Sequence, residues 1–144
     1  MRRAVRLAGR GRGLVSPGAL VGAVIVHEVT IVGEAAYKSL GGPHADTEAI
    51  AAAGERCLGS TLYVSLEPCC FEGRTPPCTD TILRSGIRRV VAATEDPHPK
   101  VRGDGFATLK RAGIEVICAT DSCPEIALQA QRQNEAIFHF NRTG

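Results

Sequence analysis

Several residue types that often mark a protein's function are scarce in this chain of 144 residues. It has no tryptophan, and aromatic residues make up 4% of it, so few rings are available for stacking on nucleic-acid bases. The formal net charge is only +2, which is too small to indicate a nucleic-acid or membrane partner. Five arginines fall within residues 1–13, and we interpret them as the solvated face of a first helix. We therefore expect neither nucleic acid nor membrane as a partner.

Long apolar runs are also missing. No stretch approaches the roughly 18–20 residues that a membrane-spanning helix needs. The basic N-terminus lacks the continuous apolar core of a secretory signal peptide, so we expect a reducing, cytoplasmic location. In that compartment, metal binding or catalysis explains at least some of the six cysteines better than three disulfides do.

What is present has the balance of a globular protein, with 44% hydrophobic and 22% charged residues. The length favours one domain over residues 1–144. Apolar, β-branched runs predict strands at 20–26, 30–35, 61–67, 88–94 and 114–119. Helices are expected at 2–10, 44–56, 78–85, 105–113 and 123–140. This alternation predicts a three-layer α/β/α sandwich around a mixed sheet of about five strands. The first two strands form an antiparallel hairpin and the later ones run parallel.

One histidine and two cysteines lie where a metal site would need them. His44 opens a predicted helix, Cys69 follows a strand, and Cys78 opens the next helix. A catalytic zinc typically has three protein ligands, which leaves its fourth coordination position open. A lone histidine before a helix is usually a cap or a surface residue, and a lone cysteine a small hydrophobe, but the combination favours zinc. Three other cysteines have no such setting, and we interpret them as structural or incidental: Cys57, Cys118 and Cys123. Cys70 neighbours a proposed ligand and could be a substitute thiol, but we interpret it as structural.

Two carboxylates follow His44. Asp46 is placed to carry protons between a water molecule and a substrate, which makes it the candidate catalytic residue. The alternative is that Asp46 is only a first-turn acid favoured by the helix dipole. Because helical positions two apart point in different directions, we expect Glu48 to face away from His44, toward solvent or a backbone amide.

The spacing of these residues resembles a known signature. Zinc nucleobase deaminases carry H-x-E followed by P-C-x-x-C, whereas this chain has HAD and a longer step between its two cysteines. Together with the stretches VGAVIV, GGPHA, LYVSLEPCC, GRTPPCTD, GIRRVVAATEDPHP and FHFNRTG, the longer form resembles the deaminase domain of the RibD family of bifunctional riboflavin-biosynthesis proteins. The resemblance covers nearly the whole chain.

The resemblance implies a cytidine deaminase-like fold and hydrolytic deamination of a diaminohydroxyphosphoribosylaminopyrimidine. It implies Zn²⁺ held by His44, Cys69 and Cys78, and substrate contacts from Arg74 and Asp96. It also implies a homodimer as a reasonable expectation, and a reductase on a separate domain or chain.

The chain departs from the family pattern around the pocket. Gly18 and Ala19 replace an Asn-Pro pair. Tyr37 and Phe71 each replace a histidine, and His98 replaces an asparagine. By the same resemblance these three positions are also candidate substrate contacts. Asp46 replaces the glutamate that acts as acid and base, and its shorter side chain moves the carboxylate by about 1 Å, a misplacement that can cost on the order of 10²-fold in rate.

These departures leave several hypotheses open. The leading one is a zinc-dependent deaminase acting on that pyrimidine or a related aminated heterocycle. The second is a catalytically weak or silent zinc-bearing domain that binds a ligand or partner. A nucleic-acid-editing deaminase is disfavoured by the cysteine spacing and the scarcity of aromatic residues. A purely structural zinc module would require four protein ligands around the metal.

Overall fold

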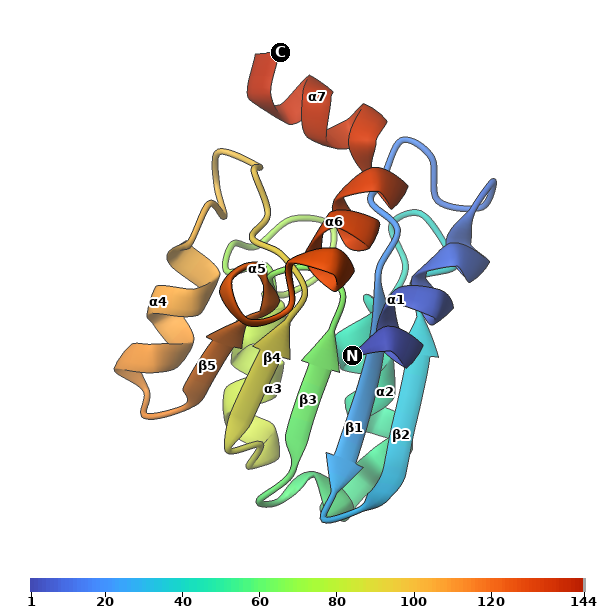
Figure 1. The fold of residues 1–144 in the computed structure, drawn as a ribbon. Coiled ribbons are helices and arrows are strands. Elements are labelled where there is room, and N and C mark those ends of the chain that lie inside the picture. The colour runs from blue at the N-terminus through green and yellow to red at the C-terminus, as the bar shows by residue number, and fades with distance from the viewer. Residues whose placement is uncertain (144) are drawn as a thin grey trace.

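The computed structural model describes residues 1–143 and is built around one five-stranded sheet (Figure 1). The strands are β1 (Gly22–His27), β2 (Thr30–Ala36), β3 (Thr61–Val64), β4 (Arg89–Ala92) and β5 (Glu115–Cys118), in the order β2-β1-β3-β4-β5. β1 pairs antiparallel with both β2 and β3, whereas β3, β4 and β5 pair in parallel. The predicted mixed sheet, with an early hairpin and parallel later strands, is confirmed.

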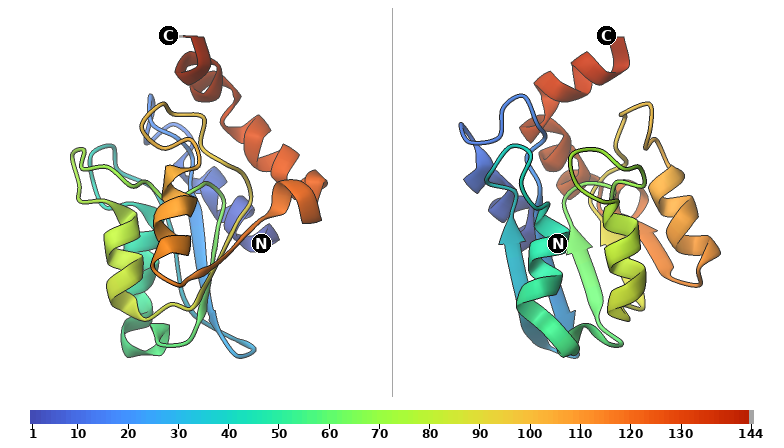
Figure 2. Two further views of the ribbon diagram at one scale, coloured as in Figure 1. Left: turned by 90° about the vertical axis from the view of Figure 1, so that its left-hand side faces the viewer. Right: turned by 180° about the vertical axis from the view of Figure 1, so that it is seen from behind.

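Helices cover both faces of the sheet (Figure 2). One face carries α2 (Ala45–Ala53), α3 (Cys78–Ser85) and α4 (Asp104–Arg111), and the other carries α1 (Arg2–Ala8) and α6 (Pro124–Gln133). The remaining helical segments are η1 (Gly9–Gly11), η2 (Gly54–Cys57), α5 (Ala119–Ser122) and α7 (Glu135–Thr143). The predicted α/β/α sandwich is therefore confirmed.

The central strands are apolar on both faces because helices cover both. Ile25 of β1 and Leu62 of β3 are fully buried in the main core, together with Leu109 of α4. Val24, whose side chain points to the opposite face, packs with Leu7 of α1. This two-sided burial explains why the β1 and β3 segments read as continuous apolar runs in the sequence.

The prediction of one continuous helix over 123–140 was wrong. The structure ends α6 at Gln133 and begins α7 at Glu135. Asn134, between them, is 3% exposed and bonds to the backbone of Leu20. Its Oδ1 atom accepts the Leu20 N–H at 2.7 Å, and its Nδ2 atom donates to the Leu20 carbonyl at 3.0 Å. A tertiary contact therefore interrupts a segment whose local sequence favours a helix.

The strand predicted over 61–67 is also shorter, since β3 ends at Val64. Beyond it the backbone still bonds to both neighbours: Ser65 donates to the Gly22 carbonyl and Glu67 to the Thr94 carbonyl. The segment that leads to Cys69 is thereby held at the end of the sheet. Among the helices of residues 1–143, none has both the length and the apolar character that crossing a membrane requires.

Candidate metal centre and active site

Three separate segments deliver the proposed metal ligands to one end of the sheet. His44 is the N-cap residue of α2, and Cys78 is the first residue of α3. Cys69 lies in the loop that follows β3. Because α2 and α3 lie side by side on the same face of the sheet (Figure 2), their N-termini meet next to this loop. Helix N-termini stabilise thiolate charge, so this placement suits metal-binding cysteines.

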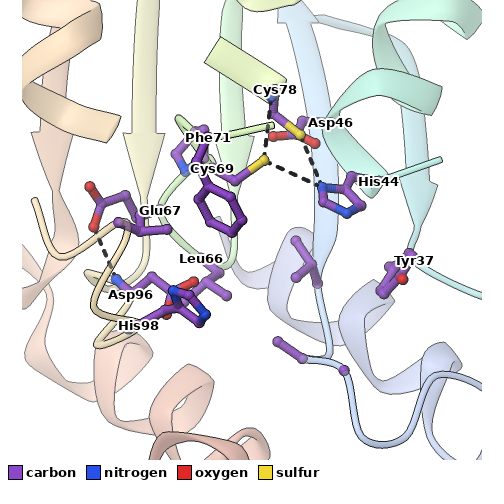
Figure 3. A pocket seen from close by; sticks show the side chains of 15 residues that line it. Tyr37, His44, Asp46, Leu66, Glu67, Cys69, Phe71, Cys78, Asp96 and His98 are labelled. Atoms are coloured by element: carbon purple, nitrogen blue, oxygen red, sulfur yellow. Dashed lines mark hydrogen bonds between the residues drawn. The ribbon is translucent and has the colours of Figure 1, made fainter. Parts of the chain in front are cut away.

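The three ligand atoms form a compact cluster (Figure 3). Nδ1 of His44 lies 3.2 Å from Sγ of Cys78 and 3.6 Å from Sγ of Cys69, and all three atoms lie within 4.8 Å of one another. Tetrahedral zinc with ordinary bond lengths would separate its ligand atoms by about 3.6 Å. The donor set and the spacing therefore fit zinc. The prediction that these residues come together is confirmed.

The two thiols differ in their electrostatic setting. Hydrogen bonds from Cys78 and from His44 lower the pKa of Cys69 to about 4, although burial opposes this shift. Hydrogen bonding to Cys69, together with burial, raises the pKa of Cys78. Metal ligation requires deprotonated cysteines, so a metal bound at this cluster would release the remaining thiol proton.

Of the two carboxylates after His44, only Asp46 reaches the cluster. It is 3% exposed, lines the same cavity as the three ligands, and accepts a hydrogen bond from the Thr47 N–H at 3.2 Å. Burial raises the pKa of Asp46, while a hydrogen bond with Cys78 opposes the rise. Glu48 is exposed, as the helical geometry predicts.

A cavity of about 210 Å³ opens beside the cluster. Four residues predicted to contact substrate line it: Tyr37, Phe71, Asp96 and His98. Burial raises the pKa of Asp96. Gly18 and Ala19, the positions that depart from Asn-Pro, line the cavity too. The structure thus gathers the departures from the family pattern around one small space.

Arg74 lies outside this cavity. Its side chain is exposed and approaches Gly41, where it lines an adjoining space of about 280 Å³. The two spaces share five lining residues: Gly18, Tyr37, His44, Cys69 and Phe71. The site is therefore divided into a metal-side compartment and an outer compartment that carries the arginine.

Aromatic contacts shape both compartments. The ring of Tyr37 meets the His44 ring edge-on, with centroids 5.2 Å apart, and its hydroxyl accepts the Gly41 N–H at 2.9 Å. Phe71 stacks on His98 with centroids 5.3 Å apart and an interplanar angle of 14°. The Lys100 ammonium lies 5.4 Å from the centre of the Phe71 ring. Two of the departures from the family pattern, Phe71 and His98, are thus packed against each other, whereas Tyr37 packs against the ligand His44.

The sequence reasoning missed Glu67, which also lines the cavity. It is 3% exposed and accepts hydrogen bonds from three backbone N–H groups. The available signal was an acid at the end of an otherwise apolar strand, directly before Pro68 and Cys69. The cysteines interpreted as structural lie outside the ligand cluster, and Cys57 is buried in the main core.

The fold and the His-Cys-Cys cluster together are typical of the class of zinc-dependent nucleobase deaminases. Residues 1–94 match the profile of the cytidine and deoxycytidylate deaminase zinc-binding region, and the chain belongs to this family. The resemblance inferred from the motifs is therefore confirmed.

Relatives place the chain within the family more closely. It is 48% identical over 140 residues to the riboflavin biosynthesis protein RibD of Aquifex aeolicus, covering 97% of this chain and 38% of that protein. It is 42% identical over 144 residues to the diaminohydroxyphosphoribosylamino-pyrimidine deaminase of Buchnera aphidicola, covering 95% of that protein. The chain therefore spans less than half of the longer relative but nearly all of the shorter one.

A solved structure shows the same relationship. The diaminohydroxyphosphoribosylaminopyrimidine deaminase/5-amino-6-(5-phosphoribosylamino)uracil reductase of Thermotoga maritima superposes with a TM-score of 0.88 at 40% identity. The match covers 98% of this chain and 40% of that one. The fold of the present chain is thus that of the deaminase part of a bifunctional enzyme.

Proposed function

We propose that this chain removes an amine from a diaminohydroxyphosphoribosylaminopyrimidine, or a closely related aminated heterocycle, by hydrolysis. The observation that carries the proposal is the meeting of His44, Cys69 and Cys78 in one cavity with the buried carboxyl of Asp46. The Buchnera relative, which matches this chain along nearly its whole length, is named for that substrate. The Aquifex relative is named for riboflavin biosynthesis, the pathway to which we assign the reaction.

The chemistry needs an activated water and a proton carrier. Zinc held by His44, Cys69 and Cys78 would lower the pKa of a water molecule toward about 7, making hydroxide available at neutral pH. Asp46 carries the proton lost by the attacking water to the amine, which leaves as ammonia. Its place in the cavity beside two of the ligands supports this role.

The surrounding residues would hold the substrate. Tyr37, Phe71 and His98 supply ring faces and edges for a flat heterocycle, since aromatic pairs favour stacked or edge-on contacts. The Asp96 carboxylate is an acceptor for exocyclic amine hydrogens. Arg74, in the outer compartment, is the candidate partner for a phosphate. The division of the site matches a substrate with a reacting ring at one end and a charged group at the other.

Ammonia release from zinc-loaded protein tests the proposal, with the riboflavin-pathway intermediate and related aminopyrimidines as substrates. We expect ammonia in proportion to the zinc-loaded protein, and none from Asp46→Ala. If the protein carries one zinc per chain yet releases no ammonia from any of them, the deaminase assignment is wrong. The chain would then be a zinc-bearing module that binds a ligand or partner, and the shortened carboxylate of Asp46 favours this second candidate.

The proposal has a wider setting. We propose that residues 1–144 act as one deaminase domain in the cytoplasm and that a reductase, on the same or a separate chain, consumes the product. The name of the Thermotoga enzyme couples the two activities, which supports this pairing. A homodimer stays a prediction, to be checked by light scattering of the purified protein.

A further inference from the structure

Glu67 is a buried carboxylate held entirely by backbone N–H groups. Its Oε2 atom accepts from Asp96 at 3.0 Å and from Gly103 at 3.1 Å, and its Oε1 atom accepts from Phe106 at 3.2 Å. Among the described residues, neither of the two recorded salt bridges involves Glu67. A buried carboxylate is costly unless hydrogen bonds compensate it, and here three donors do so. Both carboxylate oxygens of Glu67 therefore accept hydrogen bonds from the backbone segments that the side chain holds in place.

The three donors are the two ends of a loop and the start of a helix. Asp96 begins the segment 96–103, Gly103 ends it, and Phe106 lies in the first turn of α4. One carboxylate thus fastens both ends of this loop to the end of β3. Figure 3 shows the Glu67 carboxylate turned away from the metal ligands and toward Asp96.

The loop that Glu67 fastens forms one wall of the substrate cavity. Asp96, His98 and Val101 all line that cavity. Inside the loop, the His98 N–H donates to Asp96 Oδ1 at 2.9 Å, and the Lys100 N–H donates to His98 Nδ1 at 3.2 Å. These bonds orient the His98 ring, which stacks on Phe71 of the metal-binding loop. The wall therefore depends on how the two loop ends are held.

The close approach of α4 is part of the same arrangement. A Cβ atom on Gly105 would lie 2.2 Å from the Pro68 carbonyl oxygen and 3.0 Å from Glu67 Oε1. Only glycine allows the helix start to come this near, because any side chain would collide with backbone. Glu67 also lies two residues before Cys69 in the chain. The same short segment thus carries a metal ligand and sets the position of the facing wall.

We propose that Glu67 is a positioning residue that places Asp96 and His98 at the cavity, and so sets how substrate is held relative to the metal. We assign the carboxylate a positioning role because both of its oxygens accept backbone hydrogen bonds and the group is turned away from the metal ligands. The effect of Glu67 on catalysis rests on the proposed function. Its effect on the position of the cavity wall formed by segment 96–103 does not.

Glu67→Gln is the sharpest variant. An amide has one acceptor oxygen, and its NH₂ group would face at least one backbone donor, so at least one of the three bonds is lost. The ligands stay in place, because β3, α2 and α3 position them. We expect about one zinc per chain, a KM raised on the order of tenfold, and a kcat changed less than about threefold, because displaced Asp96 and His98 side chains hold the substrate less well while the metal ligands stay in place.

A substrate-free measurement separates this role from simple stabilisation. The chain has four histidines, so ring-labelled protein gives few NMR signals, and His98→Asn identifies that of His98. The ring current of Phe71 changes the chemical shift of the stacked His98 ring. The Phe71→Ala variant gives the chemical shift of the His98 signal without the stack. We expect Glu67→Gln to move the signal at least halfway to that chemical shift. Glu95→Gln is the matched control, since it removes an exposed carboxylate from the neighbouring loop position, and it should leave the signal in place.

A His98 signal that stays in place in folded, zinc-loaded Glu67→Gln would overturn the proposal. If this variant does not fold, Glu67→Asp replaces it, because it keeps two acceptor oxygens but shortens their reach. A smaller displacement of the His98 signal in the same direction supports the proposal. The absence of any displacement contradicts it. If the signal moves while wild-type protein releases no ammonia, the positioning role stands and the proposed function fails.

Discussion

Nδ1 of His44 lies 3.2 Å from Sγ of Cys78, and this contact joins the N-termini of two neighbouring helices. The residues are 34 positions apart in the chain, so only the packing of α2 against α3 brings them together. Each helix start contributes one donor, and the loop after β3 contributes Cys69.

Loss of one ligand should remove the metal. We expect His44→Ala or Cys78→Ser to bind zinc at least about a hundredfold more weakly, since changes outside the ligand set already cost 10–100-fold in metal affinity. Zinc per chain, measured by atomic emission after dialysis, should fall well below one. Cys123→Ser, which removes a thiol outside the cluster, is the control and should keep its zinc. Full occupancy in both ligand variants would refute the site.

Removal of zinc should destabilise the fold. The cluster joins α2, α3 and the loop after β3, and a metal that binds only the folded state stabilises it by about 4 kcal/mol at a thousandfold excess over Kd. A chelator should therefore lower the denaturation temperature by roughly 10 °C for a chain of this size. His44→Ala should show no such dependence on the chelator. An equal drop in that variant would mean that the chelator acts elsewhere.

The length of the Asp46 side chain should limit the rate. Asp46→Glu extends the carboxylate by one methylene into the cavity, and we expect kcat to rise by up to on the order of 10²-fold. Asp46→Ala should abolish turnover because the proton carrier is gone. Steady-state ammonia release measures both variants, and Glu48→Ala, an exposed acid on the same helix, should match wild type. Unchanged turnover in Asp46→Ala would show that protons take another path.

We expect Arg74 to contribute to binding of the substrate's phosphate and not of its ring. We expect Arg74→Gln to raise KM about tenfold for the phosphorylated substrate, with little change for its dephosphorylated form, because an ion pair with phosphate is lost. Arg84→Gln, an exposed arginine in the last turn of α3, is the matched control. Equal effects on both substrates would place the phosphate elsewhere.

Asn134 should contribute strongly to stability. Asn134→Ala leaves the partly buried N–H and carbonyl of Leu20 without these partners, and an unpaired buried group costs about 1–3 kcal/mol. Urea unfolding should therefore show a loss of roughly 2–4 kcal/mol. Gln129→Ala removes an exposed amide from α6 and should change the free energy of unfolding by less than about 0.5 kcal/mol. Similar losses in both variants would contradict the role of the Leu20 contact.

Some features of this protein follow from the sequence alone. Pro76-Pro77 before Cys78 and Gly86 after Ser85 mark both ends of α3, because proline suits a helix start and Gly86 takes the left-handed conformation that ends one. Apolar β-branched runs predict the strands. The ligand types and their helix-start positions predict zinc chemistry, and the helical period separates Asp46 from Glu48. All of these signals lie within a few residues of the feature they specify.

Other features needed the tertiary structure. Asn134 breaks a helix because its side chain pairs with Leu20, far away in the sequence. Glu67 fastens the loop 96–103 through backbone N–H groups, which leave no trace in side-chain identity. Phe71 meets His98, and Arg74 falls in the outer compartment, because two loops converge at the sheet end. Local propensity was enough to predict the existence of most helices, the five strands and the metal donors, but not every boundary. Only the folded chain decided the cavity walls, because distant segments build them.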